Sequence, residues 1–339
     1  MRADRRAGPV VAVKAPGPAS GAEPAAVRAD RRAGPVVAVK APGPAPRAEP
    51  ATARPQVVWE MIGRQLRDFR NARDISRAEA GRHIGSDETK ISRLELGRVK
   101  VKEEDLVRLL DLYRVTSVAE RRAILDLTQR ATNRQWWYQH RDLLADWFCS
   151  YLLLESAAHL IRTYEAQFIP GLLQTRAYAE AVMRLRYTDE AEVRRRVDVR
   201  MERQRILHEQ RSTRVWAVVE EAALRLQIGG PHVMREQLKA LVQANERRYI
   251  RIQVLPNSAG GHAGTGTSFS ILRLRSEKLL DVVYLEQLES AQFFTDVWQS
   301  DPYFEAWLRL SVAAGKPDDT TAVFADLLRE SIDGQKTMS

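Results

Sequence analysis

The sequence predicts a mainly α-helical protein in which a five-helix domain precedes an α+β domain, with a disordered arm in front of both. Three observations support this class. Residues 57–134 carry apolar side chains at the spacing of amphipathic helices. Residues 135–335 mix that spacing with short alternating segments that are typical of strands. Residues 1–56 are rich in proline and alanine, so they cannot bury a core.

The charge of the chain is concentrated at one end. The chain has 339 residues and a formal net charge of +9. Residues 1–56 hold ten Lys and Arg against four Asp and Glu, and residues 57–135 hold seventeen against thirteen. Residues 136–339 hold twenty-six against twenty-seven. This distribution fits a polyanionic partner at the N-terminal end, although solubility alone would also account for it.

The composition argues against several classes of protein. The one cysteine, Cys149, excludes a disulfide framework and a cysteine-based zinc site, and its apolar neighbours predict that it is buried. No apolar run approaches the ~20 residues of a membrane span. The start of the chain lacks the apolar segment of a signal peptide. We therefore expect a cytoplasmic protein with no membrane partner.

The N-terminal arm contains an internal duplication. The segment RADRRAGPVVAVKAPGPA occupies residues 2–19 and recurs unchanged at residues 28–45. One interpretation is a basic arm that adds salt-dependent phosphate contacts. The other is a duplicated low-complexity extension, with translation starting near Val57 or Met61, and the sequence favours this second interpretation.

The segment from Ser76 to Gly97 predicts two short helices joined by a tight turn. The helices are expected at residues 77–84 and 87–96, and their N-caps are predicted to be Ser76 and Ser86. A glycine allows the turn between them, and a second glycine ends the second helix. Two helices joined in this way form a helix-turn-helix, whose second helix can enter the DNA major groove.

Three further helices complete the predicted domain. They are expected at residues 57–73, 103–113 and 118–134. The first of them is amphipathic, with Met61, Ile62, Leu66 and Phe69 on one side.

Residues 60–115 resemble the XRE (xenobiotic response element, or lambda-repressor-like) helix-turn-helix family. The string KISRLELGR carries the resemblance, together with Leu66, Arg70, Ser76, Ala78, Ile84, Gly85, Ser86, Ile91, Ser92, Arg93, Leu94, Glu95 and Gly97. The resemblance implies that double-stranded DNA is the partner and that Arg70 pairs with Glu95 in a structural role. Where the family usually has alanine, this chain has Gly81, and a glycine inside a helix costs about 0.5–1 kcal/mol, so we expect a less rigid motif.

Helix geometry indicates which side chains can read DNA. At about 100° per residue, Ile91 and Leu94 point inward, and Thr89 and Arg93 lie on the opposite side. Arg93 can donate two hydrogen bonds to guanine, and Thr89 can contact a thymine methyl group or a base edge. The predicted DNA-binding residues are Arg77, Ser86, Glu88, Thr89, Lys90, Ser92, Arg93, Arg98, Lys100 and Lys102.

Several of these residues have other expected roles. Arg77 and Lys90 are placed for phosphates, as are the three basic residues of the loop at 98–102. Glu88 could accept a hydrogen bond from a cytosine amino group. The alternative, which we slightly favour, is that Glu88 complements the positive end of the helix dipole.

The C-terminal residues 135–335 predict helices first and a mixture of elements afterwards. Residues 135–185 have the pattern of two helices separated at Pro170-Gly171, and residues 189–211 that of a charged helix. The loop PNSAGGHAGTG is expected to be a flexible hairpin loop. The other expected elements are strands near 215–219, 249–255, 268–274 and 281–285, and helices near 231–247, 302–314 and 318–332.

This second part resembles the C-terminal domain of a group of actinobacterial regulators that carry an XRE-type N-terminus. The matching segments include LLLESAAHLIRTYEAQFIPGLLQTRAYA at 152–179, IGGPHVMREQLKAL at 228–241 and IQVLPNSAGGHAGTGTSFSIL at 252–272. The group includes developmental and antibiotic-production regulators, often encoded beside a small protein in an antitoxin-like arrangement. The resemblance implies that the domain binds a partner.

The sequence does not favour an enzyme. The candidate acid and base groups are Glu220, Glu221, Glu286 and His262, but no catalytic motif connects them. The loop GGHAGTG joins two predicted strands and lacks the Gly-Lys-Ser/Thr ending of a phosphate-binding loop. There is no nucleophile elbow and no His-Glu-x-x-His motif. We expect no catalytic residues, no metal and no cofactor.

The leading hypothesis is a sequence-specific DNA-binding transcriptional regulator that acts as a homodimer and is nucleoid-associated in the cytoplasm. Its C-terminal domain is expected to bind a small neighbour-encoded protein or a ligand that changes DNA affinity. The alternative is an antitoxin-like protein that sequesters this small protein and regulates its own operon.

Overall fold

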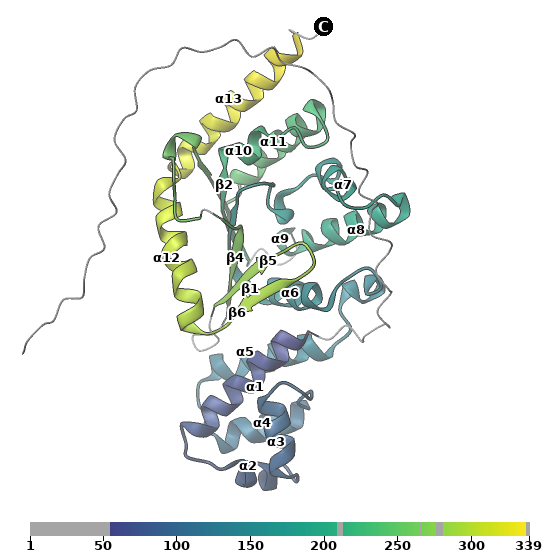
Figure 1. The fold of residues 1–339 in the computed structure, drawn as a ribbon. Helices are drawn as coiled ribbons and strands as arrows, with labels where there is room; N and C mark the ends of the chain where they lie inside the picture. The colour runs from purple at the N-terminus through teal and green to yellow at the C-terminus, as the bar shows by residue number, and fades with distance from the viewer. Residues whose placement is uncertain (1–54, 209–212, 265, 276–280, 337–339) are drawn as a thin grey trace, which may run out of the picture. The chain divides into compact units, whose positions relative to one another are not determined.

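The computed structural model describes residues 55–208, 213–264, 266–275 and 281–336. The predicted N-terminal arm, up to residue 54, lies outside these residues. Within them the chain forms a helical region followed by an α+β region (Figure 1). No helix in the described part of the chain combines the length and apolar character needed to cross a membrane.

All five predicted helices are present in the N-terminal region. They are α1 (Gln56–Asn71), α2 (Arg77–His83), α3 (Glu88–Glu95), α4 (Glu103–Leu112) and α5 (Val118–Thr132). The predicted apolar side of α1 is buried: Ile62 is 1% exposed and Leu66 is 2% exposed. These side chains form one core with Leu106, Leu109 and Ile124 of the following helices. Burial of this apolar stripe is what holds helices of such short length in place.

Two glycines allow α1 to approach α3 closely. A Cβ atom on Gly63 would lie 2.3 Å from the carbonyl oxygen of Leu94, and one on Gly97 would lie 2.6 Å from the backbone nitrogen of Glu60. Gly97 also has a φ of +66°, which suits the residue that follows a helix. The packing of α3 against α1 therefore depends on these two positions.

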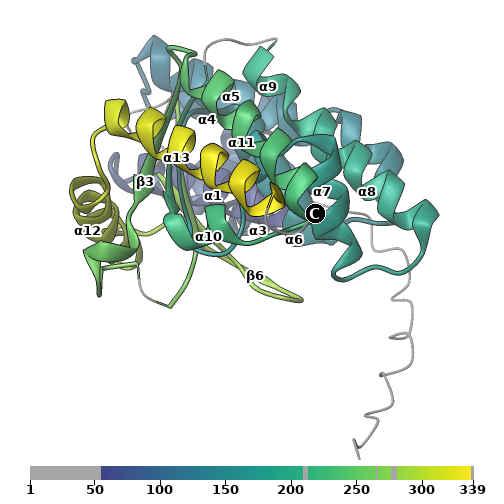
Figure 2. The same cartoon turned by 90° about the horizontal axis from the view of Figure 1, so that it is seen from above.

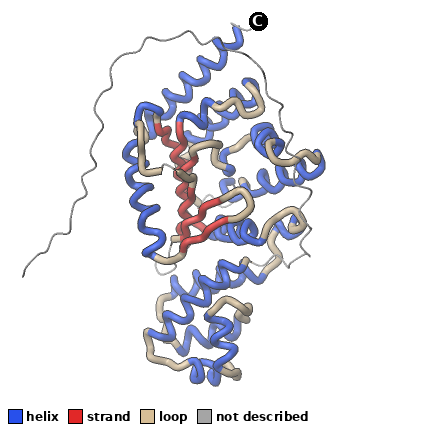
Figure 3. The backbone as a smooth tube through the Cα atoms, in the orientation of Figure 1, coloured by secondary structure: helices blue, strands red, loops and turns tan. Residues whose placement is uncertain are grey.

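The C-terminal region contains one six-stranded mixed sheet with helices on both sides (Figures 1 and 3). The strand order is β3-β2-β1-β4-β5-β6. β1 is parallel to β2, and β2 is parallel to β3, whereas the β1–β4, β4–β5 and β5–β6 pairs are antiparallel. The strands are β1 (Ala158–Glu165), β2 (Arg214–Glu220), β3 (Ile250–Leu255), β4 (Phe269–Leu274), β5 (Val282–Glu286) and β6 (Ala291–Phe294).

Helices cover the sheet unequally. α12 (Val297–Ala313) lies on one side, and α7 and α8 lie on the other, as the view from above shows (Figure 2). Trp307 and Leu310 of α12 pack with Tyr164 and Val218 on the first side. The second side has a larger core that also includes α6, α11 and α13. The remaining helices are η1 (Trp136–His140), α6 (Asp146–Ala157), η2 (Gly171–Leu173), α7 (Arg176–Arg184), α8 (Glu190–Arg203), α9 (Arg205–His208), α10 (Glu221–Arg225), α11 (Pro231–Asn245), η3 (Asn257–Ala259) and α13 (Pro317–Lys336).

The prediction that residues 135–185 are helical is wrong at β1. Residues 158–165 form a central strand, paired with β2 on one side and β4 on the other. Such a central strand need not alternate between apolar and polar residues, and β1 follows directly on the apolar helix α6. Periodicity alone cannot separate a strand of this kind from a helix.

Three other expectations need correction. β6 was not predicted. α12 begins at Val297 and carries Pro302 inside it, so the predicted start at residue 302 is too late. The loop 256–268 joins β3 to β4, which are not neighbours in the sheet, so it is not a hairpin loop.

Candidate nucleic-acid interface

The turn between α2 and α3 is fixed by caps at both helices. The Ser76 hydroxyl accepts a hydrogen bond from the Glu79 backbone nitrogen at 3.1 Å, as predicted for an N-cap. For α3, the N-cap is Asp87, whose carboxylate accepts from the Lys90 backbone nitrogen at 2.8 Å. The prediction of Ser86 as N-cap is therefore wrong by one residue. Gly85 occupies the turn with a φ of +68°.

Gly81 has a specific reason to be glycine. A Cβ atom at this position would lie 2.6 Å from the backbone carbon and oxygen of Asp87. The missing side chain thus lets the end of α2 contact the first turn of α3. Glycine at this position lowers the helix propensity of α2, but it allows α2 and α3 to approach more closely than alanine would.

A buried carboxylate joins the recognition helix to its scaffold. Glu95 of α3 accepts two hydrogen bonds from Arg70 of α1, at 2.5 Å from Nε and 3.0 Å from Nη2. Arg77 of α2 donates to the same carboxylate from Nε at 3.1 Å. Both Arg70 and Glu95 are buried, and the hydrogen bond to Glu95 raises the pKa of Arg70. This triad connects three helices and sets the orientation of α3.

The outer side of α3 is open to solvent. Ile91 and Leu94 point into the core, with exposures of 1% and 3%. Thr89 and Arg93 lie on the other side and are exposed, and Glu88 at the start of the helix is exposed as well. Ser86 and Ser92 are half-buried beside them. A helix that is anchored on one side and exposes Thr and Arg on the other can present those side chains to base edges.

The two predicted phosphate contacts on the helices are engaged within the protein. Lys90 Nζ lies 2.9 Å from the Asp105 carboxylate of α4, and Arg77 is held by Glu95 as described. Asp105 is 8% exposed, and the ion pair with Lys90 offsets part of the cost of removing its carboxylate from water. Lys90 and Arg77 therefore fix the motif in this structure.

The loop after α3 supplies the freely available positive charges. Arg98, Lys100 and Lys102 are exposed, as is Arg93. None of these four forms an ion pair with a described residue. These four exposed cations beside the outer side of α3 make a surface that suits a phosphate backbone.

Sequence reasoning missed Asp105 and Asp87. Asp105 lies in the first turn of α4, where an acidic residue is expected for helix-dipole reasons alone, so the sequence gives no signal for its contact with Lys90. Asp87 was detectable, because it lies three residues before a backbone donor of α3 and aspartate is as good an N-cap as serine.

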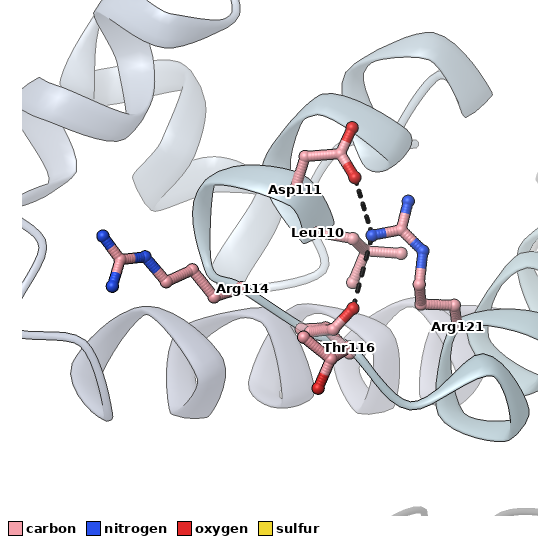
Figure 4. Close-up of a pocket in the computed structure, with 6 residues that line it drawn as sticks. Leu110, Asp111, Arg114, Thr116 and Arg121 are labelled. Atoms are coloured by element: carbon pink, nitrogen blue, oxygen red, sulfur yellow. Dashed lines mark hydrogen bonds and ion pairs between the residues drawn. The ribbon is translucent and has the colours of Figure 1, made fainter.

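An open hollow near α4 does not extend this surface. It is lined by Leu110, Asp111, Arg114, Val115, Thr116 and Arg121 (Figure 4). Arg121 bridges it, with Nη1 2.7 Å from Asp111 Oδ1 and donating to the Val115 carbonyl at 3.4 Å. None of the lining residues belongs to α2 or α3, so the hollow lies outside the predicted reading surface.

The candidate acid and base groups of the C-terminal region do not gather in one site. Glu220 accepts from the Tyr164 hydroxyl and lies 3.2 Å from His262 Nε2. Glu221 instead accepts from the Asn257 backbone nitrogen and pairs with an arginine one turn along. Glu286 accepts from Tyr284 on the opposite side of the sheet.

Comparisons with known proteins agree with this division. A family model described as a helix-turn-helix domain matches residues 62–124, which span the helices built above. A second model, described as a domain of unknown function (DUF5753), matches residues 148–326, more than half of the chain. No curated protein and no solved structure matches. The chain carries a helix-turn-helix DNA-binding domain, and it belongs to the DUF5753 family.

Proposed function

We propose that this protein is a sequence-specific transcriptional regulator that reads base edges with Thr89 and Arg93. The observation that carries the proposal is the two-sided construction of α3. Its inner side is locked to α1 and α2 through Glu95, and its outer side exposes Thr89 and Arg93. A guanidinium held in a fixed orientation can donate two hydrogen bonds to one guanine, which discriminates against other bases by about 1–3 kcal/mol.

Arg98, Lys100 and Lys102 supply the contacts that do not depend on sequence. They are exposed and unpaired with any described residue, directly after α3. Such cations add affinity by releasing counterions from DNA, and they fix the register of the helix on the duplex. Ser86, Glu88 and Ser92 complete the proposed surface. Arg77 and Lys90 act first as scaffold, and the donors that their carboxylate partners leave unused can still contact a phosphate.

The C-terminal domain is the proposed regulatory part, and the protein works as a homodimer. The helix-turn-helix match points to a regulator rather than an enzyme. The domain has a sheet of its own and is separate in sequence from the DNA-binding helices. A second half-site contacted by a second copy would extend a surface that is otherwise small for a specific interface. The domain then binds a ligand or a small protein that changes DNA affinity.

The experiment is a selection of binding sites from randomised double-stranded DNA with the full chain. Mobility-shift assays on the selected site, over a series of salt concentrations, then compare three variants. Arg93→Ala should abolish the preference for the selected site over scrambled DNA while keeping a wild-type melting temperature. Lys100→Ala should weaken binding to both DNAs and reduce the salt slope by about 1.

Arg122→Ala is the control, because it removes an exposed arginine on α5, outside the proposed surface. Its preference for the selected site and its salt slope should both equal those of the wild-type protein. A normal preference for the selected site in the Arg93→Ala variant would disprove the proposed reading of bases. Failure to select any sequence would disprove sequence-specific binding altogether.

A further inference from the structure

One edge of the sheet carries a polar cluster that DNA binding does not use. β1, β2 and β5 end at this edge, and β4 begins there, because β4 is antiparallel to both of its neighbours. In open sheets of α/β type, the crevice outside the carboxyl ends of parallel strands is a common place for ligands. The change from parallel to antiparallel pairing occurs here at β1.

On the side of the sheet that faces α8, this edge is hydroxyl-lined and acidic. The Ser270 hydroxyl donates to Thr163 at 3.1 Å, and Thr163 donates to Glu165 at 3.3 Å. In the neighbouring strand, the Tyr284 hydroxyl donates to Glu286 at 2.8 Å. Glu165 and Glu286 are the last residues of β1 and β5, the two strands that flank β4, so two carboxylates lie at this end of the sheet.

Helix α8 places two arginines at the same cluster. One of them has a carboxylate partner, and the other has a neutral partner. Arg203 makes two hydrogen bonds to Glu155, at 3.0 and 2.8 Å, and both residues are buried. Arg200 donates from Nη1 to the Gln174 side chain at 2.8 Å. It forms no ion pair with any carboxylate among the described residues, and its Nε is buried with no partner among them. A desolvated guanidinium without a counter-ion is costly.

The segment around Gln174 holds Arg200 in this position. The Gln174 side chain donates to the Ile169 carbonyl at 2.7 Å, and its backbone carbonyl accepts from Gln204 at 2.7 Å. Gln174 is 3% exposed, so its amide is fixed rather than mobile. Its oxygen is therefore directed at Arg200 by the fold.

The charges of the cluster oppose one another. Burial, together with the charge of Glu286, raises the pKa of Glu165 to about 7, although Arg200 partly counteracts this. Burial and the charge of Arg203 lower the pKa of Arg200 to about 10. Once Arg203 and Glu155 are paired, two carboxylates face one guanidinium. With Glu165 ionised, the cluster lacks one positive charge. Arg200, whose Nη1 donates to Gln174, has no carboxylate in direct contact among the described residues.

We propose that this cluster binds a small zwitterion of the amino-acid type, with its carboxylate on Arg200 and its ammonium group between Glu165 and Glu286. The inference rests on the proposed regulatory role of the C-terminal domain and names a ligand class for it. An ammonium group supplies the missing positive charge. A carboxylate supplies the counter-ion that Arg200 lacks among the described residues and an acceptor for its buried Nε.

Simpler ligands fit less well. A lone anion would meet Arg200 but would be repelled by two carboxylates. A lone amine would satisfy the carboxylates but leave Arg200 without a counter-ion. A metal ion finds no group of three or more His, Cys, Asp or Glu placed to hold it in the described part of the chain.

The test measures the melting temperature of the full chain with each standard amino acid at millimolar concentration, followed by calorimetric titration of any that raise it. At least one should bind. Its N-acetyl and carboxamide derivatives, which lack the ammonium or the carboxylate charge, should each bind at least ~10-fold more weakly to the wild-type protein. These derivatives test the proposal without any mutation.

Variants then locate the site. Arg200→Gln and Glu165→Gln should each weaken binding at least ~10-fold. Arg194→Gln, an exposed arginine on the same helix, should leave it unchanged. The proposal is overturned if no amino acid binds, or if the affinity is unaffected in both cluster variants. Because DNA binding is measured separately by mobility shift, loss of this proposal with DNA binding intact would leave the proposed function standing.

Discussion

At the residue scale, Glu95 is the position on which the DNA-binding motif depends most. It is 5% exposed and receives hydrogen bonds from both α1 and α2. A buried carboxylate with two guanidinium partners is stable only while both charges are present. Glu95 fixes the orientation of α3, because this helix cannot rotate about its axis without breaking hydrogen bonds to α1 and α2.

We expect Glu95→Gln to lower the free energy of unfolding by about 3–5 kcal/mol, since it leaves the Arg70 guanidinium buried without its counter-ion. Urea denaturation of the full chain measures this loss. Asp68→Asn, an exposed change on α1, is the control and should fall within about 0.5 kcal/mol of wild type. A comparable loss in both variants would show that the pair has no special role.

Gly81 gives a prediction whose sign separates two physical effects. Helix propensity alone would make Gly81→Ala stabilising by about 0.5–1 kcal/mol. The added Cβ atom would lie 2.6 Å from the Asp87 backbone, and this clash opposes the gain in helix propensity because backbone atoms cannot easily move aside. We expect a net destabilisation of about 1–3 kcal/mol, as in overpacked cores.

The measurement is again urea denaturation, with Gly261→Ala as the control. A Cβ atom at Gly261 meets nothing within 4 Å, so that variant should be neutral or slightly stabilising. If Gly81→Ala instead raises the stability, propensity dominates and the approach of α2 to α3 is not tight.

At the element scale, the start of α3 determines where the reading residues lie. The Asp87 carboxylate satisfies the backbone nitrogen of Lys90, one of the donors left unpaired at every helix start. We expect Asp87→Ala to cost about 0.5–2 kcal/mol, whereas Ser86→Ala should cost only a few tenths. Thermal unfolding of the two variants checks the assignment, and the reverse order of stabilities would restore Ser86 as the cap.

The helices of the DNA-binding domain were predictable because their signals are local. Ser76 and Gly97 mark ends through their own backbone preferences, and the stripe containing Ile62 and Leu66 identifies a face. The contacts that finish the site are not local. Lys90 and Asp105 belong to different helices, and nothing in the spacing of 15 residues indicates that they meet.

The sheet was predicted less well, for a physical reason. β2 and β3 are short and bounded by turns, so their patterns are clear. β1 follows an apolar helix without a break, and as a central strand it lacks the alternation of a half-exposed one. Its assignment as a helix also hid the polar cluster. Glu165 acquires its environment only because β1 and β5 flank β4 and end together, and Arg200 only because α8 packs over that edge.

At the scale of the whole molecule, the two regions carry different kinds of charge. The helix-turn-helix domain exposes cations on one surface, and the C-terminal domain holds half-buried and buried charges at the edge of the sheet. Exposed cations make DNA affinity depend on salt, whereas buried groups make stability depend on pH. The two regions can therefore be probed independently in the intact chain.

The last prediction concerns that pH dependence and follows from Glu165. Its pKa is about 7 in the folded protein, against an ordinary value of 4.5 that we take for the unfolded chain. The folded state therefore holds this proton more tightly, so the protonated group favours folding at low pH. This advantage decreases as the pH rises from about 4.5 and is fully lost above about 7. A tenfold difference in proton affinity between the two states corresponds to about 1.4 kcal/mol, so the change is at most roughly 3 kcal/mol.

Glu165→Gln removes the titration while keeping the shape of the side chain. The stability of this variant relative to wild type should therefore increase as the pH rises from 5 to 8, by up to roughly 3 kcal/mol. Urea denaturation at both pH values gives the difference, in which contributions common to the two proteins cancel. Arg203, Glu155 and Glu286 are retained in both, so only the Glu165 proton distinguishes them. A difference that stays constant between the two pH values would mean that Glu165 is solvated and titrates as an ordinary carboxylate.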